Sequence, residues 1–229
     1  MSHCIICHDP MFPQLSWRDL FTPSIPEPIC EKCASTLRPI DHNRICTTCS
    51  RPLAEKSYAC HDCITWSKHP TYSTTLDQNR ALYSYNDSLK ALIKRFKYDR
   101  DYAIASCFSK KMNEVIKIMP SYDILTPIPL NEQRLRDRSF NQSEALLIEA
   151  NLPYELLLTR TDDTTTRQAK KSKRDRHTTE NPFETAHHLA TKSILLIDDL
   201  YTTGTTIRHA AYTLKQAGAA KVSSVTVGR

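Results

Sequence analysis

A pair of carboxylates followed by a threonine-rich loop is the part of the sequence best suited to chemistry. Asp198 and Asp199 come directly after the apolar run at residues 194–197. The residues behind them supply four hydroxyls and one glycine, at Thr202, Thr203, Gly204, Thr205 and Thr206. Carboxylates accept hydrogen bonds from sugar hydroxyls and suit the water shell of a divalent metal ion, while hydroxyls and backbone N–H groups donate to phosphate. The stretch therefore predicts a sugar-phosphate site.

The elements around this loop are those that would position a phosphate. Four apolar residues in a row predict a strand buried on both faces, as in a parallel sheet covered by helices, and ligands bind at the carboxyl ends of such strands. Apolar residues at helical spacing then predict a helix from about residue 207 to Gly218, whose first N–H groups would face an anion. Gly204 stands where the backbone must turn tightly. The alternative is a threonine-rich turn with an acidic cap and no ligand.

Cysteine spacing is the second chemical signal. Eight of the nine cysteines form four C-x-x-C pairs, at Cys4 and Cys7, Cys30 and Cys33, Cys46 and Cys49, and Cys60 and Cys63. Two such pairs complete a tetrahedral zinc site, so the sequence predicts two structural zinc ions. Sequential pairing is the simplest arrangement; a crossed arrangement and redox-active dithiols are the alternatives. Cys107 lies on the apolar side of a predicted helix and is expected to be a buried small hydrophobe.

Composition divides the chain and limits its class. Residues 1–70 contain the cysteine pairs and little apolar sequence, so we expect a zinc-ribbon module there, with Trp66 packing inside it. Residues 71–229 carry strand and helix periodicity and are expected to form an α/β domain. The net charge of +6 is compatible with an anionic partner. No apolar run approaches the roughly 18 residues of a transmembrane helix, and no signal peptide is apparent, so we expect a cytoplasmic protein.

Basic residues gather in three places. Lys97 lies on a predicted helix with Lys90, Lys94 and Arg95, where a solvated face is the default expectation. Arg134, Arg136 and Arg138 follow a predicted strand over 123–128 and form either a plain basic loop or a clamp for pyrophosphate. Residues 160–182 are strongly basic without apolar periodicity, which predicts a surface loop that either is a solvated linker or closes over the site.

Two motifs resemble known families. Residues 197–206 resemble the signature by which type I phosphoribosyltransferases bind phosphoribosyl pyrophosphate (PRPP). Residues 127–130, followed by Arg134, Arg138 and the run 140–142, are similar to an element of the ComF family of competence proteins. The resemblance extends to the cysteine pairs, to residues 85–97 and to Gln168, Ser172, Asp175 and Arg176. Ser139 departs from the family's usual glycine, and Thr179 stands near a usual asparagine.

The resemblance implies a fold and a ligand. The fold would be a type I phosphoribosyltransferase-like parallel sheet flanked by helices, with an N-terminal double zinc ribbon. PRPP would bind with Mg²⁺, with Asp198 and Asp199 as the catalytic carboxylates holding the ribose and 202–206 holding the 5′-phosphate. Arg134, Arg136, Arg138 and Lys97 would contact pyrophosphate or a DNA backbone.

The resemblance also implies a cellular role. ComF proteins assist the uptake of transforming single-stranded DNA together with a competence helicase and other DNA-uptake proteins, at the cytoplasmic side of the membrane machinery. The alternative is an active phosphoribosyltransferase of nucleotide or purine salvage. The acceptor substrate leaves no visible mark in the sequence, so binding of PRPP is expected on firmer grounds than its turnover.

Overall fold

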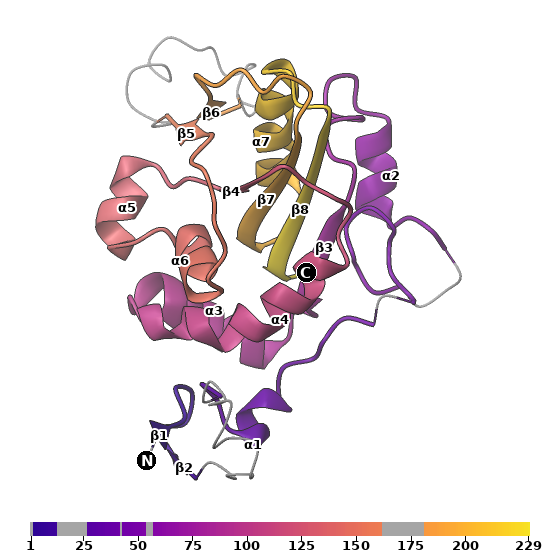
Figure 1. Cartoon of the computed structure of the whole chain (residues 1–229). Coiled ribbons are helices and arrows are strands. Elements are labelled where there is room, and N and C mark those ends of the chain that lie inside the picture. The colour runs from indigo at the N-terminus through magenta and orange to yellow at the C-terminus, as the bar shows by residue number, and fades with distance from the viewer. Residues whose placement is uncertain (1, 13–26, 42, 54–56, 162–180) are drawn as a thin grey trace, which may run out of the picture.

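The computed structural model describes residues 2–12, 27–41, 43–53, 57–161 and 181–229. Its centre is a four-stranded sheet in the order β3-β8-β7-β4, in which every neighbouring pair is parallel (Figure 1). The strands are β3 (Asn79–Tyr83), β4 (Ile124–Pro127), β7 (Ser193–Leu200) and β8 (Lys221–Gly228). Their carboxyl ends therefore meet at one edge of the sheet.

Both faces of the central strand β7 are buried, as the apolar run predicts. Leu195 and Ile197 join a core with α3 (Asp87–Tyr98), α4 (Ser106–Lys117) and α6 (Gln142–Glu149). Ile194 and Leu196 face the other way and pack with α7 (Thr205–Gln216). Because side chains alternate along a strand, a continuous apolar run serves two helical layers at once. The predicted α/β class with a parallel sheet between helices is confirmed.

Three of the helices begin at asparagine residues that cap their first turn. Asn86, Asn131 and Asn141 each accept a backbone N–H in the first turn of the helix that follows, as N-cap residues do. The helix α3 then buries Leu89, Leu92, Ile93 and Phe96 at helical spacing. A 3₁₀ turn at Tyr102–Ala105 leads into α4, where Cys107 is buried as expected and its pKa is raised to about 12 by burial.

The plain-loop alternative for Arg134, Arg136 and Arg138 is wrong. Residues Glu132–Arg138 form the short helix α5, which has no buried residue and touches α3. Asn131 caps its start, and Ser139 ends it in the left-handed region with φ of 69°. A helix defined by its caps and lacking an apolar stripe has no periodicity that a sequence pattern could reveal. Ser139 thus adopts the conformation that glycine, its usual counterpart, takes without strain.

The N-terminal part is built from short elements. The strands β1 (Ser2–His3) and β2 (Pro10–Met11) pair antiparallel, and α1 (Glu31–Ala34) lies beside them, apart from the sheet (Figure 1). The helix α2 (His61–Ser67) instead lies against the main body. The strands β5 (Thr159–Arg160) and β6 (Phe183–Glu184) pair antiparallel and bring positions 161 and 182 together. Within the described residues, no helix is long and apolar enough to cross a membrane.

Candidate functional site

The predicted ligand loop lies at the carboxyl edge of the sheet. The strand β7 continues through Asp198 and Asp199 to Leu200, and residues 201–204 turn from it into α7. Gly204 closes the turn with φ of +87°, and a Cβ atom there would lie 2.2 Å from the Tyr201 hydroxyl oxygen. Both the backbone angle and the space therefore require glycine. No side chain caps α7 at Gly204, so its first turn is suited to an anion.

The two carboxylates have different partners. Oδ1 of Asp198 accepts a hydrogen bond from Ser143 Oγ at 3.1 Å and one from the backbone N–H of Asp199 at 2.8 Å. Burial, and then the neighbouring charge of Asp199, raises the pKa of Asp198 to about 7. Asp199 instead forms an ion pair with Lys97 Nζ, and the two side chains are only 8% and 16% exposed. One carboxyl is thus neutralised by protonation near neutral pH and the other by a lysine.

The cationic face of α3 is solvated as expected at Lys90 and Lys94 but not at Arg95 and Lys97. Lys97 is held by Asp199, and Arg95 donates to the carbonyl oxygens of Ile5 and Ile6 and to Asp101. The structure therefore brings Lys97, which was predicted from a family resemblance, directly to the acidic pair. Sequence spacing gives no sign of this because the two residues are about a hundred positions apart.

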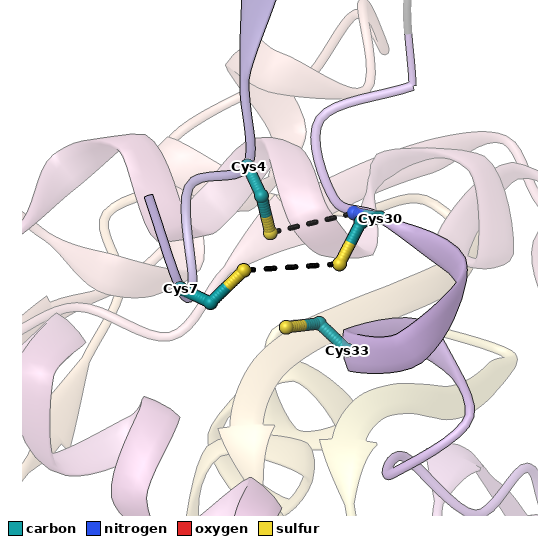
Figure 2. Close-up of side chains that lie close together, drawn as sticks. All are labelled: Cys4, Cys7, Cys30 and Cys33. Carbon is teal, nitrogen blue, oxygen red and sulfur yellow. Dashed lines mark hydrogen bonds between the residues drawn. The ribbon is translucent and has the colours of Figure 1, made fainter. Parts of the chain in front are cut away.

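The first cysteine cluster has the geometry of a metal site. Cys4, Cys7, Cys30 and Cys33 have their sulfur atoms within 4.8 Å of one another and point to a common centre (Figure 2). The Sγ atoms of Cys7 and Cys30 lie 3.8 Å apart, and the N–H of Cys30 donates to Cys4 Sγ. With Zn–S bonds of about 2.3 Å, neighbouring sulfurs of a tetrahedral site lie about 3.8 Å apart. The four thiols therefore fit zinc.

The second cluster consists of Cys46, Cys49, Cys60 and Cys63, which also lie within 4.8 Å of one another. Cys49 and Cys60 have their sulfurs 3.6 Å apart, and all four residues are buried. The sequential pairing is thus confirmed and the crossed one is wrong. All eight thiols are free of disulfides in this structure, and their grouping in fours suits two metal ions better than four dithiols.

One thiol in each cluster is poised as a thiolate. Burial raises the pKa of Cys4, but N–H groups of Cys30, Cys7 and Ile6 outweigh it and lower that pKa to about 6. Hydrogen bonds from Cys49 and Cys63 lower the pKa of Cys46. Thiolates are the form that ligates zinc.

Comparison with known proteins agrees with the geometry. The phosphoribosyl transferase domain model matches residues 142–228, which hold the acidic pair and the loop. Competence protein ComFC of Bacillus subtilis (strain 168) is 36% identical over 99% of this chain and 94% of its own length. The chain belongs to the ComFC family. Competence protein ComFC of Streptococcus pneumoniae is 31% identical over 99% of both chains, and the DNA utilization protein YhgH of Escherichia coli (strain K12) is 26% identical over 85% of this chain and 87% of its own.

The three arginines predicted to contact pyrophosphate or DNA lie in different surroundings. Arg134 and Arg136 are exposed on α5, where Arg136 contacts Glu132 and Gln133 of its own helix. Arg138 donates to Gln142 Oε1 at 2.9 Å, and the residue after Gln142 is Ser143, which holds Asp198. Of the three arginines, only Arg138 therefore contacts a neighbour in sequence of Ser143. The predicted basic loop lies almost wholly outside the described residues; Arg160 is described, and its guanidinium stacks over Phe183.

Three residues that contact the acidic pair or the loop after it were not predicted. Ser143 donates a hydrogen bond to Asp198, and Arg229 donates one to the carbonyl oxygen of Tyr201 in the ligand loop. Trp66, which was expected to pack within the zinc ribbon, donates from Nε1 to the carbonyl oxygen of Thr203. Ser143 follows the run 140–142 that carries the ComF resemblance, which is the one signal that points to it. No sequence motif marks Trp66 or Arg229, because each contacts a loop residue that is more than twenty-five positions away in the sequence.

Proposed function

We propose that this ComFC-family protein binds PRPP or a related ribose phosphate with Mg²⁺ and assists the uptake of transforming single-stranded DNA. Relatives that match nearly the whole chain are named competence proteins, and another is named a DNA utilization protein. We assign residues 1–70 to a zinc-ribbon module and 71–229 to the phosphoribosyltransferase-like domain. We also propose a cytoplasmic location, peripheral to the membrane machinery and beside a competence helicase.

The observation that carries the ligand assignment is the strand end itself. Two carboxylates, a turn that admits only glycine and the uncapped start of a twelve-residue helix follow one another within eight residues. In the proposed complex, Asp198 and Asp199 accept from the ribose hydroxyls, and Thr202, Thr203, Thr205 and Thr206 with the loop N–H groups hold the 5′-phosphate. Mg²⁺ would neutralise the pyrophosphate, with Lys97 and Arg138 as the nearest cations.

Calorimetric titration with PRPP and Mg²⁺ tests this assignment. The titration is done above the pKa of Asp198, which is about 7, so that both carboxyls are ionised. Asp198→Asn and Asp199→Asn then each remove one anionic acceptor, and we expect roughly tenfold or greater losses of affinity, about the value of a charge-assisted hydrogen bond. Asp41→Asn is the matched control, because Asp41 is exposed and, among the residues that the structure describes, its carboxyl accepts hydrogen bonds from Asn43 alone. Unchanged affinity in both site variants would refute the assignment.

The role in DNA uptake has its own test. The exposed arginines of α5 favour contact with a phosphate backbone, which is electrostatic and weakens steeply with salt. We expect a mobility shift with short single strands at low salt that Arg134→Gln and Arg136→Gln together weaken. Failure of the unmodified protein to bind at low salt would remove direct DNA contact from the proposal.

A second candidate is catalysis of phosphoribosyl transfer in nucleotide or purine salvage, with Asp198 and Asp199 as catalytic residues. The match of residues 142–228 to the phosphoribosyl transferase domain favours it. Release of pyrophosphate from PRPP in the presence of free purine bases would support this activity, and its absence with every base, while PRPP still binds, would leave a binding protein.

A further inference from the structure

We propose that the second cysteine cluster, through Arg229 and Trp66, fixes the shape of the ligand loop at residues 201–204, so that a metal site tunes ribose-phosphate binding. Arg229 and Trp66 are positioning residues in this proposal. The consequence for affinity rests on the proposed PRPP function, whereas the consequence for loop rigidity stands independently of it.

Arg229 joins the cluster to the loop with a single guanidinium. Its Nε and Nη2 atoms lie 3.3 and 3.2 Å from Cys49 Sγ. Its Nη1 atom donates to the carbonyl oxygen of Tyr201 at 3.3 Å and also to that of Thr202. The side chain is only 4% exposed. Because the guanidinium is a rigid planar fork, its contact with the sulfur atom of Cys49 limits where the two carbonyl groups can lie.

Trp66 extends the connection by one residue. It lies on α2, which begins directly after Cys60 and contains Cys63, so the cluster orients this helix. The indole Nε1 donates to the carbonyl oxygen of Thr203 at 2.8 Å. The buried guanidinium of Arg208, from the first turn of α7, stacks 5.1 Å from the indole. Cluster and loop are thus joined by two side chains from distant parts of the chain, Trp66 and Arg229.

Three successive carbonyl groups, at 201, 202 and 203, are therefore held by side chains anchored on the cluster. In a trans peptide the C=O and the following N–H point in opposite directions. Holding these carbonyls directs the N–H groups of Thr202, Thr203 and Gly204 away from the cluster. Arg229 also stacks on the ring of Tyr201, whose hydroxyl fills the space beneath Gly204.

The metal supplies what the thiols alone lack. A zinc-bound thiolate would keep its negative charge, so Cys49 would remain a strong hydrogen-bond acceptor for Arg229. Residues that hydrogen-bond to the metal ligands in this way are a general feature of metal sites. Loss of the metal would remove that charged acceptor and free α2 from the cluster, which leaves Asp62 on α2 as the other partner of Arg229, 3.4 Å from Nη2. The anchor of the loop would then weaken although none of the loop's own residues had changed.

The first cluster provides the control. Arg95 there has a parallel arrangement, donating to the carbonyl oxygens of Ile5 and Ile6 at 3.1 Å and to Asp101 at 2.6 Å. Its contacts serve the first knuckle and α3, and none reaches the ligand loop. Arg95→Gln therefore removes a guanidinium that holds two carbonyl groups next to the other metal site.

The experiment compares Arg229→Gln, Arg229→Lys, Trp66→Phe and Arg95→Gln with the unmodified protein. Three quantities are measured: zinc per chain, PRPP affinity by calorimetry with Mg²⁺, and amide hydrogen exchange of a peptide spanning 200–206. We expect Arg229→Gln to keep both zinc ions, lose about tenfold in affinity and exchange faster in the loop. Trp66→Phe should show about a threefold loss, since it removes one neutral hydrogen bond. Arg95→Gln should match the unmodified protein in both loop readouts.

Two outcomes separate the proposals. If the unmodified protein does not bind PRPP, the proposed function fails, while the exchange data still test the anchoring. If Arg229→Gln binds PRPP within twofold of the unmodified protein and its loop exchanges at the same rate, the anchoring is overturned. Should Arg229→Gln lose zinc or fail to fold, Arg229→Lys decides, because lysine keeps the charge and loses the fork; unchanged affinity and exchange in that variant also overturn the proposal.

Discussion

The two cysteine clusters have the same four thiol ligands in C-x-x-C pairs, but they occupy different surroundings. The first lies apart from the sheet, with Cys7 exposed, and its arginine partner holds carbonyl groups of the knuckle itself. The second is buried with residues of β7 and α7 in one core, and its arginine partner holds carbonyl groups of the ligand loop. One motif thus stabilises its own surroundings in the first case and positions a distant site in the second.

The largest expected effect comes from breaking each cluster in turn. Cys49→Ser should lower the free energy of unfolding by several kcal/mol, about 3 or more, because it removes both a metal ligand and part of a shared core. Cys7→Ser should cost less, since Cys7 is exposed and its cluster lies outside that core. Denaturant unfolding with zinc analysis measures both. Equal losses would show that burial in the second cluster adds nothing to stability.

A substitution of Gly204 tests the ligand loop that the second cluster is proposed to hold. Gly204→Ala forces a methyl group onto Tyr201 in a left-handed backbone, so we expect a loss of about 2 kcal/mol or more together with weakened PRPP binding. Gly218→Ala is the matched control: it also has positive φ, but its Cβ would meet no atom closer than 3.5 Å. That variant should lose only about 1 kcal/mol and bind normally. Equal behaviour of the two variants would contradict a built ligand loop.

Protonation of Asp198 gives the stability of the folded protein a pH dependence that arises at the acidic pair. Burial and the charge of Asp199 raise its pKa to about 7, so the folded protein binds more protons than the unfolded chain between roughly pH 4 and 7. The contribution of this group to the free energy of unfolding is therefore largest at low pH and falls as the pH rises through this window. Asp198→Asn should remove that fall. Unfolding measured at several pH values compares the variants, and an identical slope in both would refute the shift.

The smallest effect is expected at Ser139, on the helix that packs against α3. Ser139→Gly relieves a left-handed serine at the end of α5, and the gain is partly offset by the freer unfolded chain, which leaves up to about 1 kcal/mol of stabilisation. Thermal unfolding measures it. Ser35→Gly, at the end of α1 beside the first cluster, is the control, since Ser35 has ordinary helical angles and glycine there should destabilise.

Much of the fold was predictable because its signals are local. Residues 194–206 contain the strand, the acidic pair and the loop in one contiguous stretch. Each C-x-x-C pair lies in a single short knuckle, so its two thiols are close together whatever the rest of the chain does. The helix α5 was missed because caps define it and no buried face marks it. The solvated face assigned to α3 was right for Lys90 and Lys94 and wrong for Lys97 and Arg95, whose partners come from β7 and from the first knuckle.

By itself the sequence determined which groups could do chemistry: eight thiols suited to two zinc ions, two carboxylates and a glycine turn suited to a ribose phosphate. Only the tertiary structure decided which of these groups meet. Lys97 meets Asp199, Ser143 meets Asp198, and Cys49 meets Arg229 across 180 positions. The physical reason is that residue type and spacing control short-range geometry, whereas contacts between distant segments depend on how the packed helices and strands bring them together.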